Sequence, residues 1–364
     1  MTRAANTSAN GLFSPLTLRS VTFANRIGVS PMCMYSCEDG LANNWHLVHL
    51  GSRAVGGAGL VVAEATAVSP WARISPWDLG LWSDKHVEAL RPLAAFISEQ
   101  GSVPGIQIAH AGRKAGRLPP YQGGQPISGW ETLVAPSAVP YQQGWPQPRE
   151  LDHENLLQVT EEFAAASRRA FDAGFKVLEA HFAHGYLLHQ FLSPLSNRRT
   201  DEFGGSLENR ARFPLMVIRA MRAAWPAHLP LFVRLSVVDW ADGGLDLDES
   251  LTLASWLKEA GVDLVDCSSG SVVPKEKIPL SPGYHAPFAR QIRERTGMAT
   301  GVVGLIFDPT LASALIQDGS ADFIFLARAM LRDPYWPRTA AAVLQATNDI
   351  DIPTQYRWAL ERSL

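Results

Sequence analysis

Residues 179–210 read EAHFAHGYLLHQFLSPLSNRRTDEFGGSLENR, and a short apolar segment that predicts a strand comes directly before them. His181 and His184 stand three residues apart, and Tyr186 follows two later. Residues three apart on an extended strand point to opposite faces, so both histidines reach one site only if the chain turns between them. Gly185 permits such a bend. Three polar side chains then gather at a strand end, where such groups can hold a substrate oxygen beside a proton donor.

Spacing alone leaves three interpretations of the histidine pair open. The pair can serve catalysis, it can be structural, or it can supply two ligands of a zinc site. In the third case the protein would be a metal-dependent barrel hydrolase, with His46 or His49 as a further ligand. Carboxylates are scarce at the expected strand ends, which makes the metal interpretation the weakest of the three.

Composition narrows the class of protein. The 364 residues carry a net charge of −3 and no basic stripe, which argues against a nucleic-acid partner. Three cysteines are too few for a disulfide framework or a cysteine-ligated iron–sulfur cluster, and they suit a reducing cytoplasm. The sequence contains neither an apolar run of about 20 residues nor the apolar core of a signal peptide. We therefore expect a cytoplasmic enzyme without a membrane partner.

Eight short apolar segments alternate with helical patterns along the chain. Strands are expected at residues 27–30, 60–65, 105–109, 175–180, 231–237, 263–267, 299–303 and 322–326. Helices are expected at 46–55, 84–100 with Asp84 as N-cap, 154–173, 207–224, 248–260, 287–296, 309–317 and 335–346. Such alternation predicts a parallel sheet with helical crossovers, and eight units favour a closed (β/α)8 TIM barrel, an α/β fold.

Other segments extend this single barrel. Residues 1–11 predict a flexible lead, and the barrel is expected over 12–346, with an N-terminal hairpin cap at 16–26. A Gly/Pro-rich loop follows the third strand at 111–150, and loops of that length are usually functional. Residues 347–364 form a polar, Arg-rich tail. Neither a Gly-x-Gly-x-x-Gly fingerprint nor a phosphate loop is present.

The residues at the carboxyl ends of barrel strands are the candidates for chemistry. They are Ser30, Pro31, Met32, Cys33 and Tyr35 after the first strand, Glu64, Ala65 and Thr66 on the second, Gln107 and His110 on the third, His181, His184 and Tyr186 on the fourth, Arg234 on the fifth, Ser268 and Ser269 on the sixth, Val303 and Gly304 on the seventh, and Ala327 and Arg328 on the eighth.

Four motifs in this order resemble the old yellow enzyme family of FMN-dependent ene-reductases, from about Leu12 to the C-terminus. They are SPMCMY at 30–35, GIQIAHAGRK at 105–114, HFAHGYLLHQFLSP at 181–194 and NRRTDEFGGSLENR at 197–210. SPMCMY, with its cysteine, is similar to the bacterial thermophilic-like subclass that includes xenobiotic reductases. The histidine pair, in this family, serves catalysis.

The resemblance implies that FMN binds noncovalently at the barrel mouth. Arg328 and Gly304 would hold its phosphate, Arg234 would lie near the N1/O2 edge of the ring, and Gln107 would pair with the pyrimidine edge. The remaining cofactor-binding residues would be Ser30, Pro31, Met32, Cys33, Ala65, Val303 and Ala327.

The same resemblance implies ping-pong chemistry. NADPH or NADH would reduce the flavin, and flavin N5 would then pass hydride to an activated alkene whose carbonyl oxygen His181 and His184 grip. Tyr186 would donate the proton, while Tyr35 and Cys33 would contact the substrate. Trp358 resembles a tail residue that reaches the adjacent subunit's site, which implies a homodimer or homotetramer.

Overall fold

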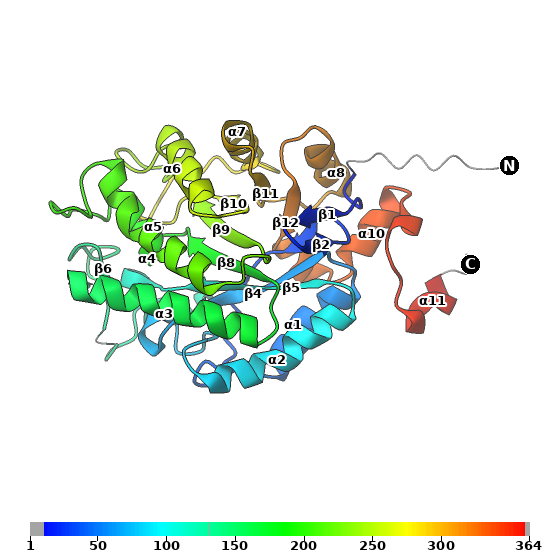
Figure 1. The fold of residues 1–364 in the computed structure, drawn as a ribbon, viewed down its shortest axis with the longest axis horizontal. Helices are drawn as coiled ribbons and strands as arrows, with labels where there is room; N and C mark the ends of the chain where they lie inside the picture. Colours follow the sequence, from blue (N-terminus) through cyan, green and yellow to red (C-terminus); the bar gives the residue numbers. More distant parts are fainter. Residues whose placement is uncertain (1–10, 131, 361–364) are drawn as a thin grey trace.

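The computed structural model describes residues 11–130 and 132–360. Eight parallel strands close into a barrel, in the order β10-β11-β12-β3-β4-β5-β8-β9. Helices surround the strands (Figure 1). The predicted TIM barrel is therefore confirmed. Most of the expected lead at 1–11 lies outside the described residues.

The barrel strands are short and almost wholly buried, as their apolar sequences predict. They are β3 (Ile27–Val29), β4 (Leu60–Ala67), β5 (Val103–Ala109), β8 (Val177–Phe182), β9 (Leu231–Ser236), β10 (Leu264–Ser268), β11 (Ala299–Val302) and β12 (Phe323–Leu326). The fourth barrel strand begins two residues later than predicted and carries His181 within it.

Helices α1 to α8 lie between strands in sequence, and α9 to α11 follow the last strand. They are α1 (Asn44–Val55), α2 (Asp84–Glu99), α3 (His153–Asp172), α4 (Leu187–Leu192), α5 (Leu207–Ala224), α6 (Leu247–Glu259), α7 (Ala286–Thr296), α8 (Pro309–Gln317), α9 (Arg328–Arg332), α10 (Trp336–Val343) and α11 (Thr354–Leu360). The N-cap prediction for α2 is wrong by one residue: Ser83 has the extended N-cap backbone, and Asp84 is the first helical residue, where its charge favours the helix dipole.

The N-terminal hairpin closes the floor of the barrel. Strands β1 (Leu16–Leu18) and β2 (Val21–Phe23) pair antiparallel, and Arg19 in their turn bonds Asp263, which directly precedes β10, at 2.7 Å. Phe23 is fully buried and packs edge-on against Phe323 with ring centroids 5.1 Å apart. The predicted cap is confirmed.

The segment 111–150 is less irregular than its composition predicts. It contains two short 3-10 turns, η2 (Gly112–Lys114) and η3 (Pro120–Gln122), and a small parallel pair, β6 (Val134–Ala135) with β7 (Arg149–Glu150). The carboxyl end of β5 leads directly into this segment, so the segment covers part of the barrel mouth.

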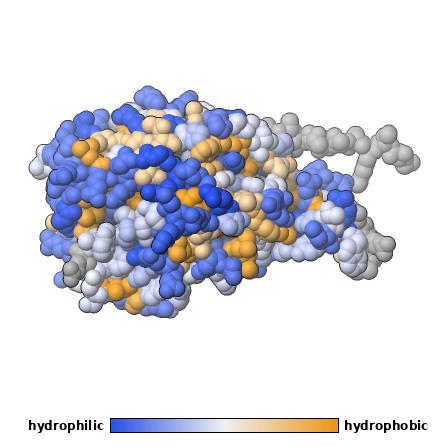
Figure 2. Space-filling view, turned by 60° about the horizontal axis from the view of Figure 1, so that its bottom comes forward, coloured by the Kyte–Doolittle hydropathy of each residue, from blue (hydrophilic) through white to orange (hydrophobic). Residues whose placement is uncertain are grey.

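The face that Figure 2 shows is mostly hydrophilic, with apolar patches interspersed among the polar residues. Among residues 11–130 and 132–360, no helix combines the length and the apolar character that crossing a membrane requires.

Candidate active site

A left-handed turn after β8 brings the two histidines and the tyrosine together. His184 has φ +58° and Gly185 has φ +68°, so the chain reverses between His181 and Tyr186. The His181 ring centroid lies 5.1 Å from that of His184 and 5.0 Å from that of Tyr186, with both ring pairs nearly perpendicular. The turn that the spacing requires is present, and the three side chains form one cluster.

His181 presents one defined hydrogen-bond donor. The backbone N–H of Ala183 donates to His181 Nδ1 at 3.2 Å, so Nδ1 carries no proton. Burial, with the Arg234 cation nearby, holds the pKa of His181 well below its usual value. The ring is therefore neutral, and Nε2 carries its single proton. A neutral N–H donor of this kind can bind a carbonyl oxygen or a phenolate without a prior protonation step.

The protonation states of His184 and Tyr186 follow from their buried surroundings. His184 Nε2 lies 2.7 Å from Ser268 Oγ, at the end of β10. Burial, together with Arg234, lowers the pKa of His184 well below its usual value, so this ring is also neutral. Burial raises the pKa of Tyr186 far above its usual value, so the phenol keeps its proton at any working pH.

A small apolar cluster forms one wall beside these polar groups. It contains Ala65 and Ala109 from β4 and β5, and Cys33 and Tyr186 pack against it. Burial raises the pKa of the Cys33 thiol, so Cys33 is a neutral wall residue. Tyr35 follows in the left-handed conformation, with φ +52°. The structure thus places Cys33, Ala65 and Tyr186 around one space.

Buried charges lie inside the barrel mouth, on neighbouring strands. Arg234 donates to Ser30 Oγ at 2.8 Å, and its Nε lies 3.3 Å from Asp266 Oδ2. Gln107 donates through Nε2 to Glu179 Oε1 at 2.7 Å. Burial raises the pKa of Glu179 to about 8, and the nearby Asp266 contributes to this shift, so Glu179 holds a proton at neutral pH. Burial raises the pKa of Asp266 as well, and Arg234 opposes that shift.

A pocket of about 150 Å³ lies between the ends of β11 and β12. Five predicted cofactor-binding residues line it together: Arg234, Val303, Gly304, Ala327 and Arg328. A Cβ added to Gly304 would lie 2.8 Å from the Tyr284 ring, so only glycine fits there. A backbone without a side chain beside a guanidinium suits a phosphate group.

His285 fixes the floor of this pocket. Its Nδ1 donates to the carbonyl of Val303 at 2.6 Å, and its Nε2 accepts from Ser269 Oγ at 2.8 Å. Trp240 Nε1 in turn donates to Ser269 Oγ at 2.8 Å. Burial lowers the pKa of His285 to about 4, which keeps the ring neutral as this arrangement requires.

The described residues contain no set of ligands that would support the metal interpretation. Among the residues that the structure describes, no group of three or more His, Cys, Asp or Glu side chains could hold a metal ion. His46, offered as a third ligand, instead pairs with Glu64 at 3.0 Å, and His49 lies buried on α1. The hydrolase alternative therefore has no centre in this part of the chain.

Two sets of residues remain apart from the cluster. Trp358 lies on α11 with 72% of its surface exposed, so one copy of the chain does not bring it to the mouth. Met32 packs against the main core, and Pro31 is half-buried in the same loop.

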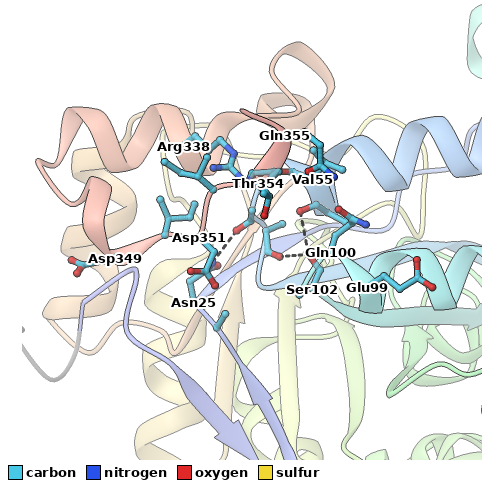
Figure 3. A pocket seen from close by; sticks show the side chains of 18 of the residues that line it. Asn25, Val55, Glu99, Gln100, Ser102, Arg338, Asp349, Asp351, Thr354 and Gln355 are labelled. Atoms are coloured by element: carbon cyan, nitrogen blue, oxygen red, sulfur yellow. Dashed lines mark hydrogen bonds between the residues drawn. The ribbon is translucent and has the colours of Figure 1, made fainter. Parts of the chain in front are cut away.

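A larger pocket of about 510 Å³ lies beneath the barrel, where Asn25 and Ser102 face Asp351 and Thr354 of the tail (Figure 3). It adjoins the amino ends of β3 and β5, away from the histidines.

Several residues that shape the site had no predicted role. They are Lys114, Glu179, Ser236, Asp266, Ser268 and His285. The sequence did contain a signal that Glu179 and Asp266 belong to the site. Each is the single carboxylate of a mostly apolar strand, and each stands two residues before another polar residue that faces the same way. The other four act through partners distant in sequence.

Comparison with known proteins gives a consistent result. The family model described as NADH:flavin oxidoreductase / NADH oxidase matches residues 11–347. An NADPH dehydrogenase of Geobacillus sp. (strain WCH70) is 48% identical over 349 residues, covering 95% of this chain and 98% of that one. An NADPH dehydrogenase of Bacillus subtilis (strain 168) is 47% identical, covering 96% and 98%. The structure of morphinone reductase superposes with a TM-score of 0.79 at 27% identity, covering 93% and 91%.

Proposed function

The chain belongs to the NADH:flavin oxidoreductase / NADH oxidase family and is an FMN-dependent NADPH dehydrogenase of the old yellow enzyme type; on that premise we propose that it reduces the carbon–carbon double bond of activated alkenes. The substrates would be α,β-unsaturated carbonyl or nitro compounds. The observation that carries the proposal is the cluster of His181, His184 and Tyr186, in which neutral donors and a protonated phenol meet.

The described residues fit FMN. The pocket lined by Gly304 and Arg328 suits its phosphate. Gln107 donates its amide N–H to Glu179, which turns its carbonyl oxygen away from that carboxyl and leaves it free to accept from a pyrimidine N–H. Arg234 is a buried cation and would stabilise negative charge on the reduced flavin ring. Bound FMN supplies hydride chemistry, taking hydride from NADPH and giving it to a second substrate.

The chain's own residues would prepare that second substrate. His181 Nε2–H, with His184 beside it, would bind the carbonyl or nitro oxygen and draw electron density toward it, which makes the β-carbon electrophilic. Tyr186 would donate its phenolic proton to the α-carbon. Cys33 and Ala65 would exclude water from one side, and Tyr35 would add a hydrogen bond to the substrate oxygen.

The tail would act in an oligomer. All residues of α11 from Thr354 to Ala359 are exposed, although the helix carries Tyr356 and Trp358. A short helix with large exposed aromatic side chains is stable only when it packs on another surface. We propose that this surface is the mouth of a neighbouring subunit, where Trp358 would contact the substrate.

One experiment tests the main proposal. The holoenzyme is reduced anaerobically with NADPH, and then cyclohexenone, a maleimide and a nitroalkene are added separately. The proposal expects NADPH to bleach the flavin absorbance and at least one alkene to restore it with formation of the saturated product. A flavin that NADPH bleaches but that none of the three alkenes reoxidises would refute the proposed substrate class.

A further inference from the structure

Four buried side chains hold the two left-handed residues of the active-site turn. His184 donates its N–H to Ser236 Oγ at 2.9 Å, and Lys114 Nζ donates to the His184 carbonyl at 2.7 Å. Gly185 donates its N–H to His189 Nδ1 at 2.9 Å, and Gln190 Nε2 donates to the Gly185 carbonyl at 2.8 Å. Every backbone polar group of this dipeptide therefore has a side-chain partner.

Such complete pairing has a physical reason. A non-glycine residue in the left-handed region is disfavoured by roughly 1–3 kcal/mol, and the surrounding structure must hold it there. His184 is such a residue, at φ +58°. Its ring direction depends on this backbone conformation, because the side chain leaves the backbone at the turn. The groups that hold the turn therefore set where the His184 ring lies relative to Tyr186.

Lys114 joins this turn to a second one after β10, and Ser236 does the same by donating its hydroxyl to the Gly270 carbonyl at 3.0 Å. Lys114 Nζ also donates to the carbonyl of Ser271 at 3.0 Å, and Ser271 is itself left-handed, at φ +73°. The two turns nearly touch: a Cβ added to Gly185 would lie 2.1 Å from the Ser271 carbonyl oxygen. The carbonyl oxygens of His184 and Ser271 both accept from Lys114 Nζ, and the ammonium offsets the repulsion between these two oxygens.

The surroundings of Lys114 show that the contact is built into the fold. The side chain is buried, and its Nζ lies 4.8 Å from the Tyr141 ring centroid and 5.0 Å from that of Tyr186. Burial, with Arg117 and Arg113 nearby, lowers the pKa of Lys114 to about 7. Such a costly position is retained only where the lysine makes several specific contacts.

Lys114 lies in the motif GIQIAHAGRK, whose last residues had no role. The preceding Arg113 extends the same connection, since its Nη2 donates to the Val272 carbonyl at 2.6 Å. We propose that Lys114 is a positioning residue that locks the turn after β8 to the turn after β10 and so fixes His184 and Tyr186 for the substrate. The inference rests on the proposed ene-reductase function.

The test compares two cation deletions on the same segment. Lys114→Met keeps the apolar stem and removes both hydrogen bonds, whereas Arg117→Met removes a neighbouring cation that bonds the Gly124 carbonyl and leaves the turn alone. The dissociation constant of a phenol, whose oxygen binds as a phenolate in place of the substrate oxygen, is measured by its absorbance change on binding. The rates of flavin reduction by NADPH and of reoxidation by cyclohexenone are measured separately, with FMN content and melting temperature.

We expect Lys114→Met to weaken phenol binding about tenfold or more and to slow reoxidation by a similar factor, as loss of charge-assisted hydrogen bonds to a positioned turn should. FMN content and reduction by NADPH should stay close to those of the parent. Arg117→Met removes a neighbouring charge but keeps both hydrogen bonds of Lys114, so it should change phenol binding far less than Lys114→Met does. Phenol affinity within about twofold of the parent in FMN-loaded Lys114→Met would overturn the positioning role.

A second variant keeps the proposal testable if Lys114→Met does not fold. If Lys114→Met fails to hold FMN, Ser236→Ala takes its place, because it removes the acceptor of the His184 N–H and should weaken phenol binding in the same way. An unchanged Ser236→Ala would then overturn the proposal. A parent enzyme that neither binds phenol nor reduces any alkene would refute the proposed function itself, whereas a competent parent with unaffected variants would refute the positioning role alone.

Discussion

His46 Nε2 donates to Glu64 Oε1 at 3.0 Å, and both side chains are buried. The other carboxylate oxygen, Oε2, accepts the backbone N–H of Met34 at 2.8 Å, and the ladder between β4 and β5 shifts register at Glu64. This pair therefore anchors the loop on which Cys33 and Tyr35 lie.

Replacing Glu64 by alanine should destabilise the protein and loosen this loop. Removing the buried carboxylate leaves the His46 Nε2–H and the Met34 N–H without an acceptor, and each unsatisfied donor costs roughly 1–3 kcal/mol. We expect a lower melting temperature of the FMN-loaded protein and a higher KM for an enone. Glu99→Ala, at the exposed end of α2, is the matched control and should change neither value. Equal effects from both substitutions would contradict the anchoring role.

His181→Ala should weaken phenol binding by about 10- to 100-fold, since a hydrogen bond to a charged oxygen is worth roughly 1.5–3 kcal/mol. FMN content should remain unchanged, because His181 donates from Nε2 toward the substrate space and receives Ala183 N–H at its other nitrogen. Absorbance titration with a phenol measures the affinity. The exposed His153→Ala is the control, and an unaltered phenol affinity in His181→Ala would remove His181 from the oxygen-binding role.

Tyr186→Phe should slow reoxidation by an enone about 100-fold, the usual scale of general-acid catalysis, and leave flavin reduction by NADPH unaffected. Burial raises the pKa of Tyr186, so the proton stays available as pH rises from about 6 to 9. Stopped-flow measurement of each half-reaction gives the comparison. Equal slowing of both half-reactions would indicate a structural role instead of proton donation.

The barrel was predictable from sequence because each strand is a local apolar run. The fourth strand was misplaced by two residues since Phe175 is apolar and buried although it precedes β8. Helices α4 and α9 were missed because six or five residues are too few to show a helical period.

The site was predictable in part, for a related reason. Residues at the carboxyl ends of the strands all lie at one mouth of a barrel, regardless of the contacts they make there. His181, Arg234 and Gly304 could therefore be assigned to one site from the sequence. The contacts that orient them join segments apart in sequence: Lys114 to Ser271 across 157 residues, and His285 to Val303 across 18 residues. No local pattern encodes such pairs, and only the fold reveals them.

Acid should destabilise the protein through His285. Its folded pKa of about 4 lies below the ordinary 6.5, so between these values the unfolded chain binds a proton that the folded protein excludes. Stability is therefore present above pH 6.5 and is lost as pH falls toward 4, by about 3 kcal/mol for this group. His285→Gln should flatten the dependence of melting temperature on pH over this range. The exposed His153→Gln should keep the parent's slope, and an unchanged slope in His285→Gln would contradict the assignment.

Asp266→Asn should raise the reduction potential of the bound FMN. The carboxylate lies 3.3 Å from Arg234 Nε and partly neutralises the cation assigned to the flavin's electron-accepting edge. Removing the negative charge leaves Arg234 more positive, which stabilises the reduced, anionic cofactor by roughly 1–2 kcal/mol, or on the order of 20–40 mV. Glu179→Gln is the matched control: burial raises the pKa of Glu179, so the parent already carries a neutral group there. A spectroscopic titration against a redox dye gives both potentials. A lower potential in Asp266→Asn would show that the aspartate's main effect is to hold Arg234 in place, and equal shifts in both variants would show that Glu179 carries a charge as well.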